Sequence, residues 1–168
     1  QLRAILRASS YGHIRIMFPM IISPDELREA KKVVEECKKE LRDKQIPFDE
    51  EIEVGMMMET PASVILAGIF AKEADFFSIG TNDLTQYLLA VDRGNKKIAG
   101  MYDCFHPAVL SAIQTIIQAG HKENIMIGMC GEMAGNPKAV PLLLDMGLDE
   151  FSVSTSNIDY VRKMVLEH

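Results

Sequence analysis

Two acidic residues with the chemistry of metal ligands follow two short apolar runs. Glu59 comes directly after Met56-Met57-Met58, and Asp83 lies a few residues beyond Phe76-Phe77-Ser78-Ile79. Both runs suit strands that are covered on both faces, and consecutive parallel strands are commonly neighbours. Neighbouring strands lie about 4.8 Å apart, and carboxylates roughly 4.5 Å apart repel by roughly 4 kcal/mol at an effective dielectric of 20. A cation would relieve this repulsion.

Magnesium is the cation that such a pair favours. It prefers oxygen ligands and usually keeps several positions for water and substrate, so two carboxylates suffice. In the simpler alternative, Glu59 only favours the start of its helix and Asp83 is an N-cap. For either residue alone the simpler alternative is favoured. For both together, one βα unit apart, a Mg²⁺ site is favoured.

Three further residues, at a helix start, in a polar loop and just beyond a predicted strand, have chemistry that suits a ligand site. Arg93, in an Asp-Arg-Gly-Asn loop, could clamp a phosphate or carboxylate with its planar fork, although a lone loop arginine is commonly just solvated. Asn82 at a helix start could add an amide donor beside free backbone N–H groups. Cys130 lies just beyond a predicted strand beside Gly131 and is the candidate reactive thiol, although its position also allows a structural role.

Composition limits the classes of protein to which the chain can belong. Its 168 residues allow one domain, and 48% of them are hydrophobic, as expected for a globular fold. The net charge of −6 argues against nucleic acid as the main partner. The sequence contains no apolar run of membrane-spanning length, and its amino terminus lacks the apolar core of a signal peptide. We therefore expect a cytoplasmic protein without membrane insertion.

Strands and helices are predicted to alternate along the whole chain. The predicted strands are 14–20, 52–58, 76–79, 125–129 and 151–153, and the predicted helices are 2–8, a long helix from Pro24 that ends by Pro47, 62–73, one that starts at Asn82, 107–119, 137–146 and 158–166. This alternation predicts an α/β fold of parallel strands joined by right-handed crossovers. A flavodoxin-like open sheet and part of an eight-stranded TIM barrel, which needs roughly 250 residues, both fit.

Several motifs carry a resemblance to one family. Residues 15–20, 55–62, 76–87 and 128–135 resemble the phosphoenolpyruvate-binding barrel of bacterial enzyme I, the phosphoenolpyruvate–protein phosphotransferase that starts the sugar phosphotransferase system. The likeness covers essentially the whole chain. Pyruvate phosphate dikinase and phosphoenolpyruvate synthase share part of these motifs, and Ala90-Val91-Asp92-Arg93-Gly94-Asn95 points to enzyme I among them.

The resemblance implies a fold and a set of roles. Residues 1–168 would be the carboxyl-terminal portion of the phosphoenolpyruvate-binding barrel domain, comprising the last five βα units of a TIM (β/α)8 barrel. Glu59 and Asp83 would be the magnesium ligands, and Asn82 and Arg93 would contact phosphoenolpyruvate. Cys130 would donate the proton that converts the enolate into pyruvate. The loop from Met101 to Phe105 differs from the form expected for the family.

The resemblance also implies partners that lie outside this chain. These are the phosphohistidine domain of the parent enzyme, the phosphocarrier protein HPr and a second copy in a homodimer. The arginines that grip the phosphate from earlier strands are not in this sequence, so we expect the chain alone to bind phosphoenolpyruvate weakly and to transfer no phosphoryl group. The alternatives are a non-catalytic dimerisation scaffold, a fragment of pyruvate phosphate dikinase or phosphoenolpyruvate synthase, and a stand-alone flavodoxin-like binding domain.

Overall fold

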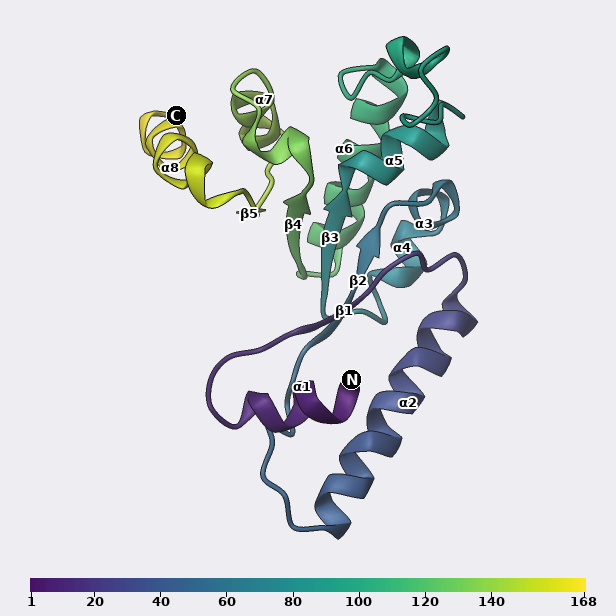
Figure 1. Cartoon of the computed structure of the whole chain (residues 1–168), viewed down its shortest axis with the longest axis vertical. Coiled ribbons are helices and arrows are strands. Elements are labelled where there is room, and N and C mark those ends of the chain that lie inside the picture. Colours follow the sequence, from purple (N-terminus) through teal and green to yellow (C-terminus); the bar gives the residue numbers. More distant parts are fainter.

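The computed structural model describes residues 1–168 and contains one parallel sheet of five strands (Figure 1). The strands are β1 (Ile16–Phe18), β2 (Val54–Met58), β3 (Phe76–Gly80), β4 (Met126–Cys130) and β5 (Glu150–Phe151), and they are adjacent in that order. A flavodoxin-like sheet places its first strand between the second and the third. That alternative is therefore wrong, and the sequential order is the one expected of consecutive βα units in a barrel.

Eight α-helices and three 3₁₀ turns connect the strands. They are α1 (Leu2–Ser9), α2 (Pro24–Asp43), α3 (Pro61–Ile65), α4 (Ala67–Phe70), α5 (Thr81–Leu88), α6 (Pro107–Lys122), α7 (Ala139–Asp145), α8 (Ile158–Glu167), η1 (Ala99–Met101), η2 (Glu132–Gly135) and η3 (Thr155–Asn157). The prediction of one helix over 62–73 was wrong, because the backbone of Leu66 (φ −97°, ψ 11°) leaves the helical region and separates α3 from α4.

Helix α2 starts as its sequence predicts. The Ser23 side chain accepts a hydrogen bond from Glu26 N, and Pro24 occupies the first turn, where no N–H partner is needed. The Glu26 carboxylate reaches back past the N-cap and accepts a hydrogen bond from Ile22 N at 2.8 Å. These caps end the loop after β1 and start the longest helix of the fold, which Figure 1 shows beside the sheet.

One face of the sheet carries the hydrophobic core. Alternate residues of the strands point to opposite faces, and those pointing toward the helices are almost completely buried: Met56, Met58, Phe77, Ile79, Ile127 and Met129. Helices α4 and α6 pack on them with Phe70, Ile113 and Ile116. A smaller cluster joins α1 and α2 to β1 through Leu6, Val34 and Ile16.

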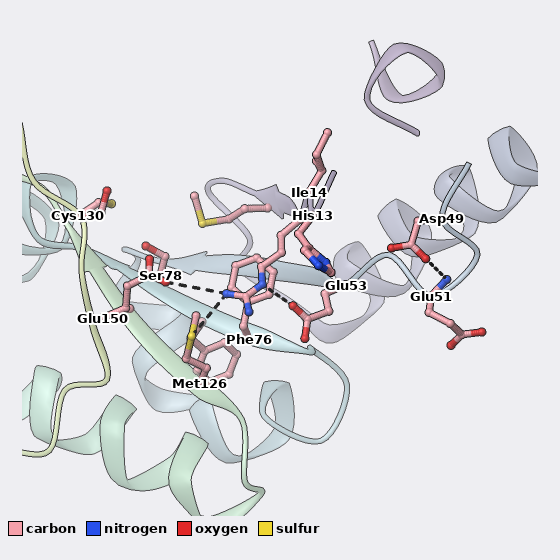
Figure 2. Close-up of a pocket in the computed structure, with 15 residues that line it drawn as sticks. His13, Ile14, Asp49, Glu51, Glu53, Phe76, Ser78, Met126, Cys130 and Glu150 are labelled. Carbon is pink, nitrogen blue, oxygen red and sulfur yellow. Dashed lines mark hydrogen bonds and ion pairs between the residues drawn. The ribbon is translucent and has the colours of Figure 1, made fainter. Parts of the chain in front are cut away.

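The opposite face, which we call the inner face, has no helix on it. Its side chains, among them Phe76 and Glu53, line an open cavity of about 740 Å³ (Figure 2). Arg15 lies over the Phe76 ring and contacts the Glu53 carboxylate. The Arg15, Glu53 and Glu150 side chains are 44–52% exposed. In a closed barrel this face would line the interior, so five strands leave it open.

Two aspartates fix the start of the sheet in the same way. Asp75, just before β3, accepts a hydrogen bond from Val54 N at 2.7 Å, and Asp149, just before β5, accepts one from Ile127 N at 2.8 Å. Each also donates its backbone N–H to the same residue of the preceding strand. The register at the amino end is therefore set by side chains as well as by the ladder.

None of the helices has the length and hydropathy needed to cross a lipid bilayer.

Candidate active site at the carboxyl end of the sheet

The strand register brings Glu59, Gly80 and Cys130 to one level of the sheet. Met58 pairs with Ile79, so Glu59 follows at the level of Gly80, which itself pairs with Cys130. Neighbouring strands lie about 4.8 Å apart, which puts the backbones of Glu59 and Cys130 roughly 10 Å apart with Gly80 between them. An acid and a thiol thus stand on either side of a position without a side chain.

The Glu59 carboxylate is buried and only partly paired. The residue is 3% exposed, and Oε1 accepts a hydrogen bond from Met20 N at 2.8 Å. Met20 holds a left-handed backbone (φ 57°), which L-residues rarely adopt, and its N–H points at the acid in that conformation. Oε2 has no hydrogen-bond donor and lies against Gly80, where an added Cβ would be 2.7 Å away.

The start of α3 holds Glu59 from the other side. The Thr60 hydroxyl accepts from Ser63 N at 3.0 Å, and the Ser63 hydroxyl accepts from Thr60 N at 3.2 Å, which makes a buried reciprocal capping box. Thr60 also donates to the carbonyl of Ile21 at 3.1 Å. The residue after Glu59 is therefore fixed, and the carboxylate has little freedom to move toward water.

The charge of Asp83 acts on Glu59. Burial is the main cause that raises the pKa of Glu59; the Met20 N–H opposes it, and the negative charge of Asp83 raises this pKa further. Two carboxylates therefore lie within Coulombic reach in a partly dehydrated place. No group of three or more His, Cys, Asp and Glu side chains surrounds a common point. The pair fits an ion such as Mg²⁺, which takes its other ligands from substrate and water.

Asp83 lies in the first turn of a helix, which agrees with the helix start predicted at Asn82. Helix α5 begins at Thr81, immediately after β3, so Asp83 is the third residue of its first turn. The alternative prediction that Asp83 is an N-cap is wrong, because Gly80 holds that position and no side chain caps it. Arg93 Nη2 lies 3.4 Å from Asp83 Oδ1, and both side chains are partly exposed.

Asn82 and Cys130 share a second cavity, of about 510 Å³, at this rim. The Asn82 amide oxygen accepts from Glu132 N at 3.2 Å, which leaves its NH₂ group free to donate to a ligand. Gly131 adopts φ 96°, and a Cβ there would come within 2.5 Å of Thr81 Oγ1. Only glycine allows the chain after β4 to approach α5 this closely.

Cys130 is the last residue of β4. The predicted strand ended at Met129, so the strand runs one residue further than predicted. It is partly exposed, and its Sγ lies 3.7 Å from the carbonyl of Ile79 as a donor. Figure 2 shows it at one end of the inner-face cavity, opposite the end formed by Asp49 and Glu51. The thiol is therefore reachable from both cavities.

Sequence reasoning missed two residues that support this site. Tyr102 donates from its hydroxyl to the carbonyl of Asn82 at 3.3 Å, which ties the loop before α6 to the first turn of α5. Met20 supplies the only hydrogen bond to the Glu59 carboxylate. Tyr102 lies in the loop from Met101 to Phe105, which differs from the form expected for the family. The residue type of Met20 gives no sign of its left-handed backbone.

Comparison with known sequences identifies the family. A sequence model described as PEP-utilising enzyme, PEP-binding domain, matches residues 1–168. The chain belongs to this family. Two relatives of this PEP-binding domain are named phosphoenolpyruvate-protein phosphotransferase: one from Haemophilus influenzae, 54% identical over 165 residues, and one from Buchnera aphidicola subsp. Baizongia pistaciae, 56% identical over 167 residues. They match 98% and 99% of this chain, which spans 29% of the length of each.

Solved structures show what the PEP-binding domain resembles in fold. A citrate lyase from Burkholderia xenovorans LB400 matches 95% of this chain and 51% of its own, with a TM-score of 0.67 at 20% identity. An HpcH/HpaI aldolase/citrate lyase family protein from Burkholderia cenocepacia J2315 matches 99% of this chain and 69% of its own, with a TM-score of 0.62 at 17% identity. These likenesses concern the arrangement of strands and helices alone.

Proposed function

We propose that this chain is the carboxyl-terminal part of the phosphoenolpyruvate-binding barrel of a phosphoenolpyruvate–protein phosphotransferase. The parent enzyme would transfer phosphoryl from phosphoenolpyruvate to a protein histidine, the first step of sugar uptake phosphorylation. One observation carries the proposal: Glu59, Gly80 and Cys130 stand at one level of the sheet, with the charge of Asp83 acting on Glu59. The 54–56% identity to proteins of that name supports it further.

In this proposal the acids hold Mg²⁺ and the cationic and amide groups hold the substrate. Glu59 Oε2, which accepts no hydrogen bond, and the Asp83 carboxylate would be the two protein ligands. When bound, the ion would neutralise charge on the phosphate and carboxylate oxygens of phosphoenolpyruvate. The Asn82 NH₂ group and the Arg93 guanidinium would donate hydrogen bonds to the same anionic oxygens.

Cys130 would supply the proton of the second half of the reaction. Transfer of the phosphoryl group to histidine breaks the P–O bond and leaves the enolate of pyruvate. The Sγ–H proton then moves to C3 of the enolate, which gives pyruvate and a thiolate, and water returns a proton to the sulfur. The partly exposed thiol, reachable from both cavities, suits this exchange.

The partners of the parent enzyme are part of the proposal. They are its phosphohistidine domain, the phosphocarrier protein HPr beyond it and a second copy in a homodimer, all acting in the cytoplasm. A second candidate function, a self-associated scaffold, is favoured by the unpaired edges of β1 and β5 and by the open inner face. Sedimentation tests the scaffold in one direction: a chain that stays monomeric at micromolar concentration would count against it, whereas self-association fits both candidates.

A chimera tests the proposed function. Residues 1–168 would replace the matching segment of the Haemophilus influenzae relative, and two steps would be measured: transfer of ³²P from phosphoenolpyruvate to the protein histidine, and formation of pyruvate. We expect transfer by the chimera and a loss of at least about a hundredfold with Cys130→Ser in the pyruvate-forming half, as for removal of a general acid. A folded chimera without transfer would contradict the proposal.

The chain by itself should behave differently. The resemblance implies that arginines of other strands grip the phosphate in the parent enzyme, so we expect calorimetry of residues 1–168 to show only weak binding of phosphoenolpyruvate and no phosphoryl transfer. Tight, magnesium-dependent binding by the 168-residue chain would show that five βα units suffice.

A further inference from the structure

Arg93 lies against the carboxylate that is proposed to hold the metal. Its Nη2 is 3.4 Å from Asp83 Oδ1, and Asp83 is the only acidic residue with which it forms an ion pair. The two side chains are 45% and 35% exposed. Because both already contact water, the pair can separate without uncovering apolar surface. The guanidinium therefore has one acidic partner, which is a proposed metal ligand, and the Tyr102 hydroxyl lies beside it.

The loop backbone is fixed while the side chain is free to move. Arg93 N donates to the Gln86 side chain of α5 at 3.2 Å, and Gly94 N donates to Asp92 Oδ1 at 2.8 Å. These bonds hold the turn at the end of α5. Only the torsions of the Arg93 side chain have to change for the guanidinium to leave Asp83, and it stays within the same rim when it does.

A divalent ion and a guanidinium compete for this carboxylate. Each is attracted by the same negative charge, and the two cations repel each other at the few ångströms that separate neighbouring ligands. The charge of Asp83 also acts on Glu59, so an ion shared by both acids gains from two carboxylates where Arg93 gains from one. The freed guanidinium presents its planar fork to phosphate or carboxylate.

We propose that Arg93 is a latch on Asp83 that the divalent cation opens, so that the metal binds first and releases the guanidinium for the anionic substrate. This inference rests on the proposed function, since it takes Asp83 as a metal ligand and Arg93 as a substrate ligand. Competition of this kind is reciprocal: Arg93 weakens metal binding by the factor by which the metal weakens the Arg93–Asp83 pair.

The test measures metal affinity in the absence of substrate. Mn²⁺, which carboxylates bind as they bind Mg²⁺, is titrated into the 168-residue chain and its free signal is followed by electron paramagnetic resonance. Arg93→Met should tighten binding about two- to fivefold, the range expected from an exposed ion pair. Lys96→Met and Lys97→Met are charge-matched controls in the same loop, because neither lysine forms an ion pair, and they should change the affinity far less.

A second readout follows the latch directly. The ¹⁵Nε–Hε resonance of Arg93 should shift when Mg²⁺ saturates the chain, and Glu59→Gln should abolish the shift. Binding that depends on Glu59 but is equally tight in wild type and Arg93→Met, or an Arg93 resonance that Mg²⁺ leaves unchanged, would overturn the latch alone. Failure of every variant to bind Mn²⁺ would overturn the metal site and the latch with it.

Discussion

The two faces of the sheet belong to the same strands but differ in how completely the chain covers them. On the helix side Phe77 and Ile127 are 0% exposed. On the inner face Met17 is 38% exposed, and the solvent-exposed Arg15 side chain lies near two carboxylates. The helix side completes its packing within 168 residues. The inner face stays open, although the carboxyl end of the sheet already holds the candidate active site. Folding and chemistry thus depend on different sides of the strands.

The largest difference between the faces should appear on truncating core side chains. Phe77→Ala removes a fully buried ring and should lower the free energy of unfolding by about 3–5 kcal/mol, while Met17→Ala on the inner face should cost less than about 1 kcal/mol. Urea unfolding followed by circular dichroism measures both. Equal costs would mean that the inner face is covered in solution, by another copy or by a rearranged segment.

Two glycines sharpen the comparison within the inner face. Gly80→Ala would place a Cβ 2.7 Å from Glu59 Oε2 and should weaken Mn²⁺ binding about tenfold by moving the carboxylate. Gly128→Ala, on the neighbouring strand, would meet only Glu150 at 3.4 Å, an ordinary contact, and should leave the affinity unchanged. Similar losses of Mn²⁺ affinity in both variants would mean that metal binding does not depend on the position of the Glu59 carboxylate.

The charged part of the inner face should contribute little in this chain. Arg15 contacts Glu53, lies 3.9 Å from Glu150 and is 44% exposed, so Arg15→Met should change the free energy of unfolding by less than about 1 kcal/mol. In the complete barrel that we propose, the same replacement would leave two acids in a dry interior and should cost about 3–5 kcal/mol. Equal effects in the short and long proteins would contradict an inner face that closes.

The smallest effect concerns the protonation of Glu59. Burial is the chief cause that raises the pKa of Glu59, so the charged carboxylate destabilises the folded state. This destabilisation is absent at pH values below the usual glutamate pKa and is fully present above the raised pKa of the folded state. Glu59→Gln should therefore raise Tm slightly at pH 7 without metal, and the gain should fade as pH drops toward 4. A gain that persists at low pH would point to packing instead.

The sequence predicted the core of this fold because that part depends on local pattern. All five strands and the helix that starts at Pro24 follow from apolar runs and residue types that neighbours in sequence supply. The strand order did not follow from spacing, and the break at Leu66 did not follow from periodicity.

The candidate site divides in the same way. The sequence pointed to Glu59, Asn82, Asp83, Arg93 and Cys130 because their types, and their places at strand ends, at a helix start or in a polar loop, suit a ligand. The Met20 N–H that holds Glu59 and the Tyr102 hydroxyl that holds Asn82 come from residues 39 and 20 positions away. Such contacts depend on tertiary geometry, which a single sequence does not display.

Paramagnetic broadening of Cys130 by bound Mn²⁺ tests the central claim most directly. With ¹³Cβ-labelled cysteine, Cys37 in the α1–α2 cluster serves as the internal reference in the same chain. We predict that substoichiometric Mn²⁺ broadens the Cys130 resonance, that Mg²⁺ reverses the broadening, and that neither Glu59→Gln nor Asp83→Asn shows it. Bound Mn²⁺ that leaves Cys130 sharp, or that broadens it equally in both variants, would contradict an acid pair and a thiol sharing one site.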